Sequence, residues 1–259
     1  MKLRNEKASS KLKKIQRKKE RKMKKDSKRI KNLKALIVEE FYSFDQGISL
    51  LKQLGTAKFI ESVEAHISLN IDPKYANQQL RTSLVLPNGT GKTLRIAVFT
   101  EAENVAEALK NGATIAGSDD LMEEINAGNL NFDLLITTPQ LMPKLAKLGR
   151  VLGPKGLMPS PKSGTVTTNL NQAIAEFQKG KVEYRADKTG IVHLSFGKVN
   201  FSPEQLKENL LAVYSSIEKN KPSGVKGRYF KSFSICTTMS PGIRIELGSF
   251  KKAALQSNS

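Results

Sequence analysis

Two short segments carry side chains that suit contact with a polynucleotide. Residues 56–62 read "TAKFIES" and place Lys58 beside Phe59. A lysine next to an exposed aromatic ring can bind phosphate while the ring stacks or packs on a base or sugar. Residues 236–242 read "CTTMSPG" and gather hydroxyls and one methionine, and such hydroxyls suit 2′-OH and phosphate groups. Each pattern also has a purely structural explanation, with Phe59 in the core and the hydroxyls in an ordinary turn.

A third segment, residues 184–190 with the sequence "YRADKTG", is basic and has the turn signal of a hairpin tip. Its Lys188 is a candidate phosphate contact, and the same residues would equally make a plain turn.

One glycine-rich segment resembles a phosphate-binding loop but lacks two features of that motif. In "PNGTGKTL", residues 87–94, the triplet from Gly91 to Thr93 matches the end of that motif. The motif needs a glycine where Leu86 stands, and it must open a helix, whereas here a strand follows. We predict no nucleotide site in this loop.

Catalytic and metal chemistry have no positive sequence signal. His66 and His193 are the two histidines, far apart in the chain and without a carboxylate or cysteine cluster at ligand spacing. No G-x-S-x-G motif supports a nucleophile. The single cysteine, Cys236, excludes intrachain disulfides and cysteine-rich zinc sites and favours a reducing compartment. We expect no catalytic residue, no metal and no cofactor.

Charge favours a polyanionic partner. The 259 residues carry a net charge of +19, of which +14 falls in residues 1–34 and +5 in the remainder. Lysine and arginine that neutralise phosphates make binding strong and salt-dependent. The alternatives are a solubilising tail or a transit peptide, although serine is sparse and acids are present in residues 1–34. With few apolar residues, this extension should be disordered on its own. No apolar run is long enough to span a membrane.

The elements that must position these residues come in two styles. Residues 62–71 alternate apolar and polar, which predicts a half-buried antiparallel strand with "RTSLVLP" as a partner. The preceding helix should be capped by Asp45 and stopped by Gly55. Between residues 93 and 180, strands and helices alternate, which favours a parallel sheet covered by helices. After Gly180, a predicted hairpin at "DKTG", a helix capped by Ser202 and two further strands return to the antiparallel style.

This order predicts an α/β protein with one domain inserted into another. A two-layer α/β domain with a mainly antiparallel sheet is built from both chain ends, and the insertion is a Rossmann-like three-layer α/β domain. Glycines at both connections favour a hinge. The predicted parts are a basic extension (1–34), domain I (35–88 with 181–250), domain II (89–180) and a flexible tail (251–259), with hinge residues Gly89, Gly91 and Gly180.

Residues 149–167, "GRVLGPKGLMPSPKSGTVT", resemble the signature of the ribosomal protein L1 family. Three further segments fall where that family has corresponding ones: residues 56–81, 182–201 and 221–245. The resemblance runs from about residue 35 to 248 and is nearest to the chloroplast and cyanobacterial branch.

The resemblance implies a two-domain structural protein of the large ribosomal subunit, not an enzyme. It further implies binding to an rRNA helix, a mobile stalk at the tRNA exit site that assists release of deacylated tRNA, and in some members repression of translation from their own mRNA. Contacts with other ribosomal proteins should be weak, and no membrane or homo-oligomer is expected. The expected location is the chloroplast (plastid) ribosome, with the bacterial cytoplasm as the alternative. The runner-up function is a nucleotide-dependent or hydrolytic enzyme on the Rossmann-like part.

The expected RNA surface combines the residues that the resemblance implies with those chosen for their chemistry. It comprises Lys58, Phe59, Glu61, Ser62, Lys188, His193, Lys198, Ser234, Thr237, Thr238, Met239 and Ser240. Lys155 and Lys162, in the 149–164 segment, are expected as secondary contacts. Ser240 stands where the family usually has glycine, so its side chain is expected to alter the local geometry.

Overall fold

A computed structural model of the protein describes residues 26–256 apart from residue 226. The chain divides into two compact units, residues 1–38 and 39–259. The first unit contains helix α2 (Lys28–Ala35), whose N-cap Ser27 accepts a hydrogen bond from the Ile30 amide. The predicted disorder is therefore wrong for this stretch, because a cap and an ion pair between Asp26 and Lys34 support a helix. The prediction for residues 1–25 lies outside the described residues.

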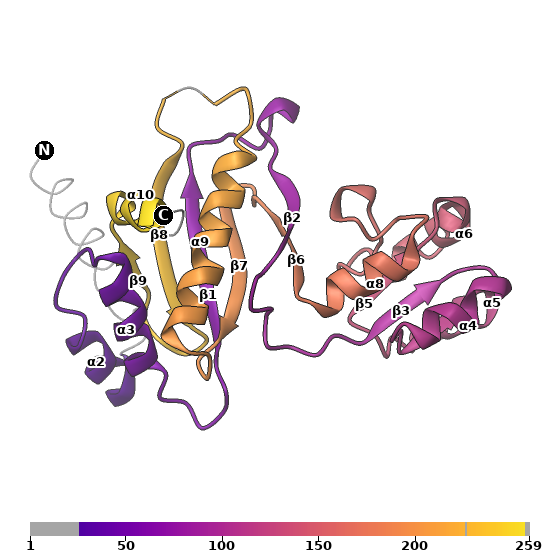
Figure 1. Ribbon diagram of the computed structural model, residues 1–259, viewed down its shortest axis with the longest axis horizontal. Helices are drawn as coiled ribbons and strands as arrows, with labels where there is room; N and C mark the ends of the chain where they lie inside the picture. Colours follow the sequence, from indigo (N-terminus) through magenta and orange to yellow (C-terminus); the bar gives the residue numbers. More distant parts are fainter. Residues whose placement is uncertain (1–25, 226, 257–259) are drawn as a thin grey trace, which may run out of the picture. The chain divides into compact units, whose positions relative to one another are not determined.

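A four-stranded antiparallel sheet organises the second unit, in the order β7-β1-β8-β9 (Figure 1). Its strands are β1 (Ser62–Leu69), β7 (Ile191–Lys198), β8 (Phe230–Thr237) and β9 (Ile243–Ile245). The apolar positions of β1 are fully buried, in strict alternation with half-buried polar ones. Helices α3 (Phe44–Leu54), α9 (Pro203–Lys219) and α10 (Leu247–Gln256) pack against this sheet. One face of the sheet thus forms a core and the other reaches the surface, which is the predicted two-layer arrangement.

The predicted N-cap is correct for one helix and wrong for another. Ser202 caps α9 with Pro203 in its first turn, as predicted. Helix α3 is capped by Ser43 and not by Asp45, because the Gln46 side chain accepts the Ser43 amide in a capping box.

A second, parallel sheet has the order β4-β3-β5 and helices on both faces. Its strands are β3 (Ile96–Phe99), β4 (Ile115–Gly117) and β5 (Leu134–Thr137). Ile96 and Val98 pack with residues of α4 (Ala102–Lys110) and α8 (Leu170–Gln178). Ala97 and Phe99 pack on the other side with α5 (Asp119–Asn126), α6 (Met142–Ala146) and α7 (Gly149–Leu152). The predicted α/β fold with a three-layer, Rossmann-like part is confirmed.

One predicted strand pairing is wrong, and the predicted hairpin forms only next to its turn. Strands β2 (Arg81–Val85) and β6 (Lys181–Arg185) pair with each other in a separate two-stranded sheet. β1 cannot accept β2, because β7 and β8 already occupy both of its edges. The turn at residues 187–190 exists, and next to it the Asp187 amide donates to the Ile191 carbonyl at 2.8 Å and Ala186 forms an antiparallel bridge with Val192, but β6 and β7 belong to different sheets.

Two further segments contain helix: the proline- and glycine-rich residues 149–164 and the tail that was expected to be flexible. The proline- and glycine-rich stretch begins as α7, because Leu152 is fully buried and Leu157 and Met158 pack against the same core. Three short 3-10 turns lie at Ala76–Gln78, Pro139–Leu141 and Pro161–Ser163. The tail predicted from residue 251 is helical to Gln256 in α10, where buried Phe250 packs on aromatic rings of the core. Among the described residues, no helix is long and apolar enough to cross a membrane.

Candidate nucleic-acid interface

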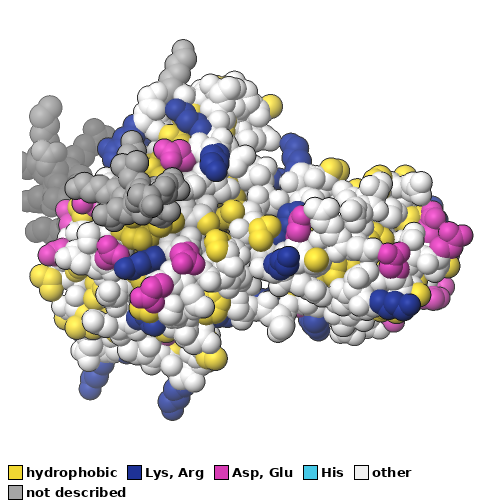
Figure 2. All heavy atoms as spheres, viewed as in Figure 1, with side chains coloured by type: hydrophobic (Ala, Val, Ile, Leu, Met, Phe, Trp, Pro, Cys, Tyr) yellow, Lys and Arg dark blue, Asp and Glu magenta, His cyan; other side chains and the backbone are white. Residues whose placement is uncertain are grey.

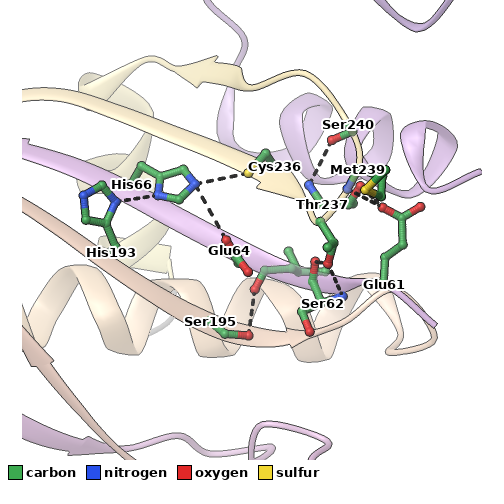
Figure 3. A network of polar contacts seen from close by, with 12 residues as sticks. Glu61, Ser62, Glu64, His66, His193, Ser195, Cys236, Thr237, Met239 and Ser240 are labelled. Atoms are coloured by element: carbon green, nitrogen blue, oxygen red, sulfur yellow. Dashed lines mark hydrogen bonds and ion pairs between the residues drawn. The ribbon is translucent and has the colours of Figure 1, made fainter. Parts of the chain in front are cut away.

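The loop before β1 and the turn after β8 meet at one end of the four-stranded sheet (Figure 3). The Ser62 amide donates to the Thr238 hydroxyl at 3.0 Å, and the Thr238 amide donates to the Ser62 carbonyl at 3.1 Å. These reciprocal bonds join the two segments that the sequence singled out, although they are far apart along the chain.

Glu61 lies beneath both loops and organises them. Its carboxylate accepts hydrogen bonds from the Ala57 amide at 2.9 Å, the Thr237 hydroxyl at 2.7 Å and the Met239 amide at 2.9 Å. Glu61 is 2% exposed and Thr237 is 1% exposed. These two predicted RNA residues therefore hold the loops in place and present almost no surface of their own.

Exposed apolar side chains surround the buried Glu61 and Thr237. Phe59 is 54% exposed, Ile60 63% and Met239 49%. Lys58 is exposed beside them. The structure therefore places Phe59 on the surface and not in the core. Ile60 was not predicted to belong to this surface, and the sequence signal for it was its position next to Phe59 in a short segment between α3 and β1.

Ser240 fits the turn through its hydroxyl. The Thr237 amide donates to Ser240 Oγ at 2.9 Å, and that hydroxyl donates to the Pro241 carbonyl at 3.1 Å. Among the described residues, no residue other than glycine has a positive φ, so the serine causes no backbone strain of that kind.

The polar face of the sheet continues away from these loops. Lys198 donates to the Ser62 hydroxyl at 2.8 Å, and the β1–β7 register sets these residues opposite each other. Ser234 on β8 lies opposite His66 on β1, with His193 on the other side. The structure thus gathers Ser62, Lys198, His193 and Ser234 on one face, while Lys188 is exposed in the turn beyond β6.

The remaining predicted residues lie in other parts of the chain. Lys155 and Lys162 are exposed on the segment that follows α7, beside the parallel sheet. Gly89, Gly91 and Gly180 all have positive φ values. A Cβ on Gly180 would meet the Gly89 Cα at 2.5 Å, so the two connections touch backbone to backbone.

The two histidines do lie in a cluster, contrary to the prediction. His66 Nδ1 and His193 Nδ1 are 2.8 Å apart, and His66 Nε2 lies 3.2 Å from Cys236 Sγ and 4.0 Å from Glu64 Oε2 (Figure 3). Sequence spacing could not reveal this cluster, because the cross-strand register assembles it from β1, β7 and β8.

The environment of the cluster shifts two of its pKa values. Burial lowers the pKa of His66, the neighbouring His193 lowers it further, and Glu64 acts in the opposite direction. Burial, helped by the Glu64 charge, raises the pKa of the Cys236 thiol to about 11. His66 is therefore neutral and Cys236 a thiol near pH 7.

Comparison with known proteins gives a consistent result. The model of the ribosomal protein L1p/L10e family matches residues 50–241. Large ribosomal subunit protein uL1c of Trieres chinensis is 61% identical over 229 residues, which cover 88% of this chain and 100% of that protein. The uL1c protein of Guillardia theta is 58% identical over 90% of this chain and 100% of its own length. The uL1 protein of Prochlorococcus marinus (strain NATL1A) is 57% identical over 87% of this chain and 96% of its own length. On this evidence of sequence and fold, the chain belongs to the ribosomal protein L1p/L10e family.

Proposed function

We propose that this chain binds an rRNA helix of the large ribosomal subunit through the loops that Glu61 holds together. The coarser function follows from the family: the chain is a structural protein of the large ribosomal subunit and not an enzyme. Relatives that are 58–62% identical are named uL1c, the plastid form, so the plastid ribosome is its location.

The observation that supports RNA binding most directly is the exposed pair Phe59 and Met239 beside Lys58, on loops anchored by a buried carboxylate. A folded protein leaves large apolar side chains exposed together when they form a contact surface. Aromatic and apolar groups beside a lysine suit the unstacked bases and sugars of a structured RNA. The rigid anchoring reduces the ordering cost of binding, because the loops already have their hydrogen bonds.

The distribution of charge also favours the four-stranded sheet and its loops as the RNA surface. Helices α4 and α5 and the residue before α4 are rich in acids, and Figure 2 shows acidic side chains along the outer edge of that part, with others over the part that contains the four-stranded sheet. The acids of the two helices and of the residue before α4 are Glu101, Glu103, Glu107, Asp119, Asp120, Glu123 and Glu124. Phosphate would be repelled there, which leaves the four-stranded sheet and its loops as the better RNA surface.

We also propose the domain division at residues 88–89 and 180–181, with Gly89, Gly91 and Gly180 as a hinge. Two adjacent glycine-bearing connections that both adopt positive φ support it. A hinged domain suits the proposed roles at the tRNA exit site, namely release of deacylated tRNA from a mobile stalk. Repression of translation from its own mRNA would use the same loops, and Lys155 and Lys162 would serve as secondary contacts.

Fluorescence anisotropy with the rRNA helix bound by family members tests the proposal. We expect log affinity to fall linearly with log salt concentration. Met239→Ala should cost about 1–3 kcal/mol of binding free energy, the value of a good specific contact. Lys58→Gln should reduce the salt slope by about one phosphate contact, whereas the matched variant Lys110→Gln on α4 should not change it. Equal affinity for any duplex of the same length would contradict specific recognition, and co-sedimentation with ribosomes would test assembly independently.

A further inference from the structure

The polar face of the four-stranded sheet contains a compact set of nitrogen, sulfur and oxygen donors. Glu64, His66 and Cys236 each offer one ligand atom, and these atoms all lie within 4.8 Å of one another (Figure 3). Two of them are on β1 with one residue between, so they share a face, and Cys236 is the β8 partner of Glu64. Hydrogen-bonded strands on both sides thus hold the three backbones.

The spacing of the donors suits a tetrahedral cation. Zinc bonds of about 2.0–2.3 Å to nitrogen, oxygen and sulfur place neighbouring ligands roughly 3.3–3.7 Å apart. The His66 Nε2 to Cys236 Sγ distance is 3.2 Å, and the Nε2 to Glu64 Oε2 distance is 4.0 Å. The Glu64 side chain is 39% exposed, so it has room to rotate towards the other two.

The protonation of the cluster is compatible with a metal ligand at His66. The 2.8 Å bond between the two Nδ1 atoms needs one N–H and one lone pair. When His66 donates from Nδ1, its Nε2 carries the lone pair that accepts the Cys236 thiol proton. A divalent ion would replace that proton between Nε2 and Sγ, binding the thiolate and releasing one proton to solvent.

A second layer of contacts would orient the ring. In this tautomer His193 accepts at Nδ1 and directs its Nε2–H towards Asp187, whose Oδ2 is 3.7 Å from Nε2. A carboxylate and a second imidazole behind a ligating histidine fix its orientation and raise its basicity.

We propose that Glu64, His66 and Cys236 form a binding site for a borderline-soft divalent cation of the zinc class, with its fourth position open to solvent. The donor set excludes magnesium as the preferred ion, because that cation favours oxygen ligands in an octahedral arrangement. The site goes beyond the proposed RNA binding and does not depend on it, and its test contains no RNA.

Cobalt(II) is the probe, titrated into the untagged, reduced full-length chain and followed by absorbance. A thiolate-to-cobalt charge-transfer band can come only from Cys236, because the chain has one cysteine. We expect that band at one ion per chain, with tetrahedral d–d bands, displacement by zinc and no displacement by magnesium. The absence of the band at excess cobalt would overturn the proposal.

Variants identify the other ligands. Cys236→Ser should abolish the charge-transfer band, and His66→Gln should lower cobalt affinity at least about 100-fold. Glu64→Gln should also lower it, and His193→Gln should lower it about tenfold, as expected for a residue that acts through another. The control Ser232→Ala, on the same face of β8 and opposite Ser68, should leave cobalt affinity unchanged. Thermal unfolding checks that each variant is folded. If Cys236→Ser does not fold, the zinc affinity of the His66→Gln variant is measured as the second test. Unchanged affinity in both His66→Gln and Glu64→Gln would overturn the site, because cobalt would then be bound by the cysteine alone.

Discussion

The Thr237 hydroxyl donates to the buried Glu61 carboxylate at 2.7 Å, across 176 residues of sequence. The same carboxylate oxygen accepts the Met239 amide, and the other oxygen accepts the Ala57 amide. One side chain therefore sets the relative position of the two loops that carry the exposed Phe59 and Met239. A buried charge is stabilised in this way only when several donors converge on it.

Glu61→Gln should lower the free energy of unfolding by about 1–3 kcal/mol, the cost of a buried polar group with a mismatched partner. The amide nitrogen would face at least one of the N–H or O–H donors that the carboxylate now accepts. Chemical denaturation measures the loss, and RNA affinity should fall with it because the loops lose their anchor. The exposed Glu123→Gln on α5 is the matched control and should change neither quantity.

Phe59→Ala should separate binding from stability. Since the ring is 54% exposed, the free energy of unfolding should change by no more than about 0.5 kcal/mol. The affinity for the rRNA helix should fall by about 1–3 kcal/mol, the value of a base stacked on an aromatic ring. Tyr75→Ala removes another aromatic ring, 60% exposed, and should leave affinity unchanged. An unaltered affinity in Phe59→Ala would argue against this loop as the contact surface.

Gly180→Ala tests the close approach of the two connections. Gly180 has a φ of +99°, and an added Cβ would lie 2.5 Å from the Gly89 Cα. Gly128 has a φ of +85° with nothing within 4 Å of an added Cβ, so Gly128→Ala reports the cost of the left-handed conformation alone. We expect about 1–2 kcal/mol for Gly128→Ala and a larger loss for Gly180→Ala in thermal or chemical unfolding. Equal losses would show that the backbone contact does not constrain the connections.

Asp187 should make the stability of the β6–β7 turn depend on acid pH. Its carboxylate accepts the Ile191 amide, the Thr189 hydroxyl and the Thr189 amide, and these bonds lower its pKa to about 2. Because the pKa is lower in the folded state, its contribution is complete above the unfolded value of about 3.9 and is lost as pH falls towards 2. Unfolding measured between pH 5 and pH 2 should show a smaller acid-dependent loss in Asp187→Asn than in the wild-type chain. A loss of the same size in both would mean that other carboxylates account for the acid dependence.

The sequence by itself determined the elements and the family. The alternation in residues 62–69 places one face of β1 in a core, and the strand–helix alternation up to residue 180 indicates a parallel sheet. These are local periodicities, which depend on the chain geometry of strands and helices and need no knowledge of distant partners. The adjacent lysine and aromatic residue, Lys58 and Phe59, could be recognised as a short-range pattern for the same reason, whereas only the structure shows that the ring is exposed.

Only the tertiary structure decided which strands pair and which side chains meet. The pairing of β2 with β6 depends on edges of β1 already occupied by β7 and β8, a condition set by strands more than 100 residues away. The burial of Glu61 and the meeting of His66 with His193 and Cys236 depend on the register between strands from both ends of the chain. A register shift of one residue would turn these side chains to the opposite face, and nothing in their own sequence neighbourhood encodes which register is formed.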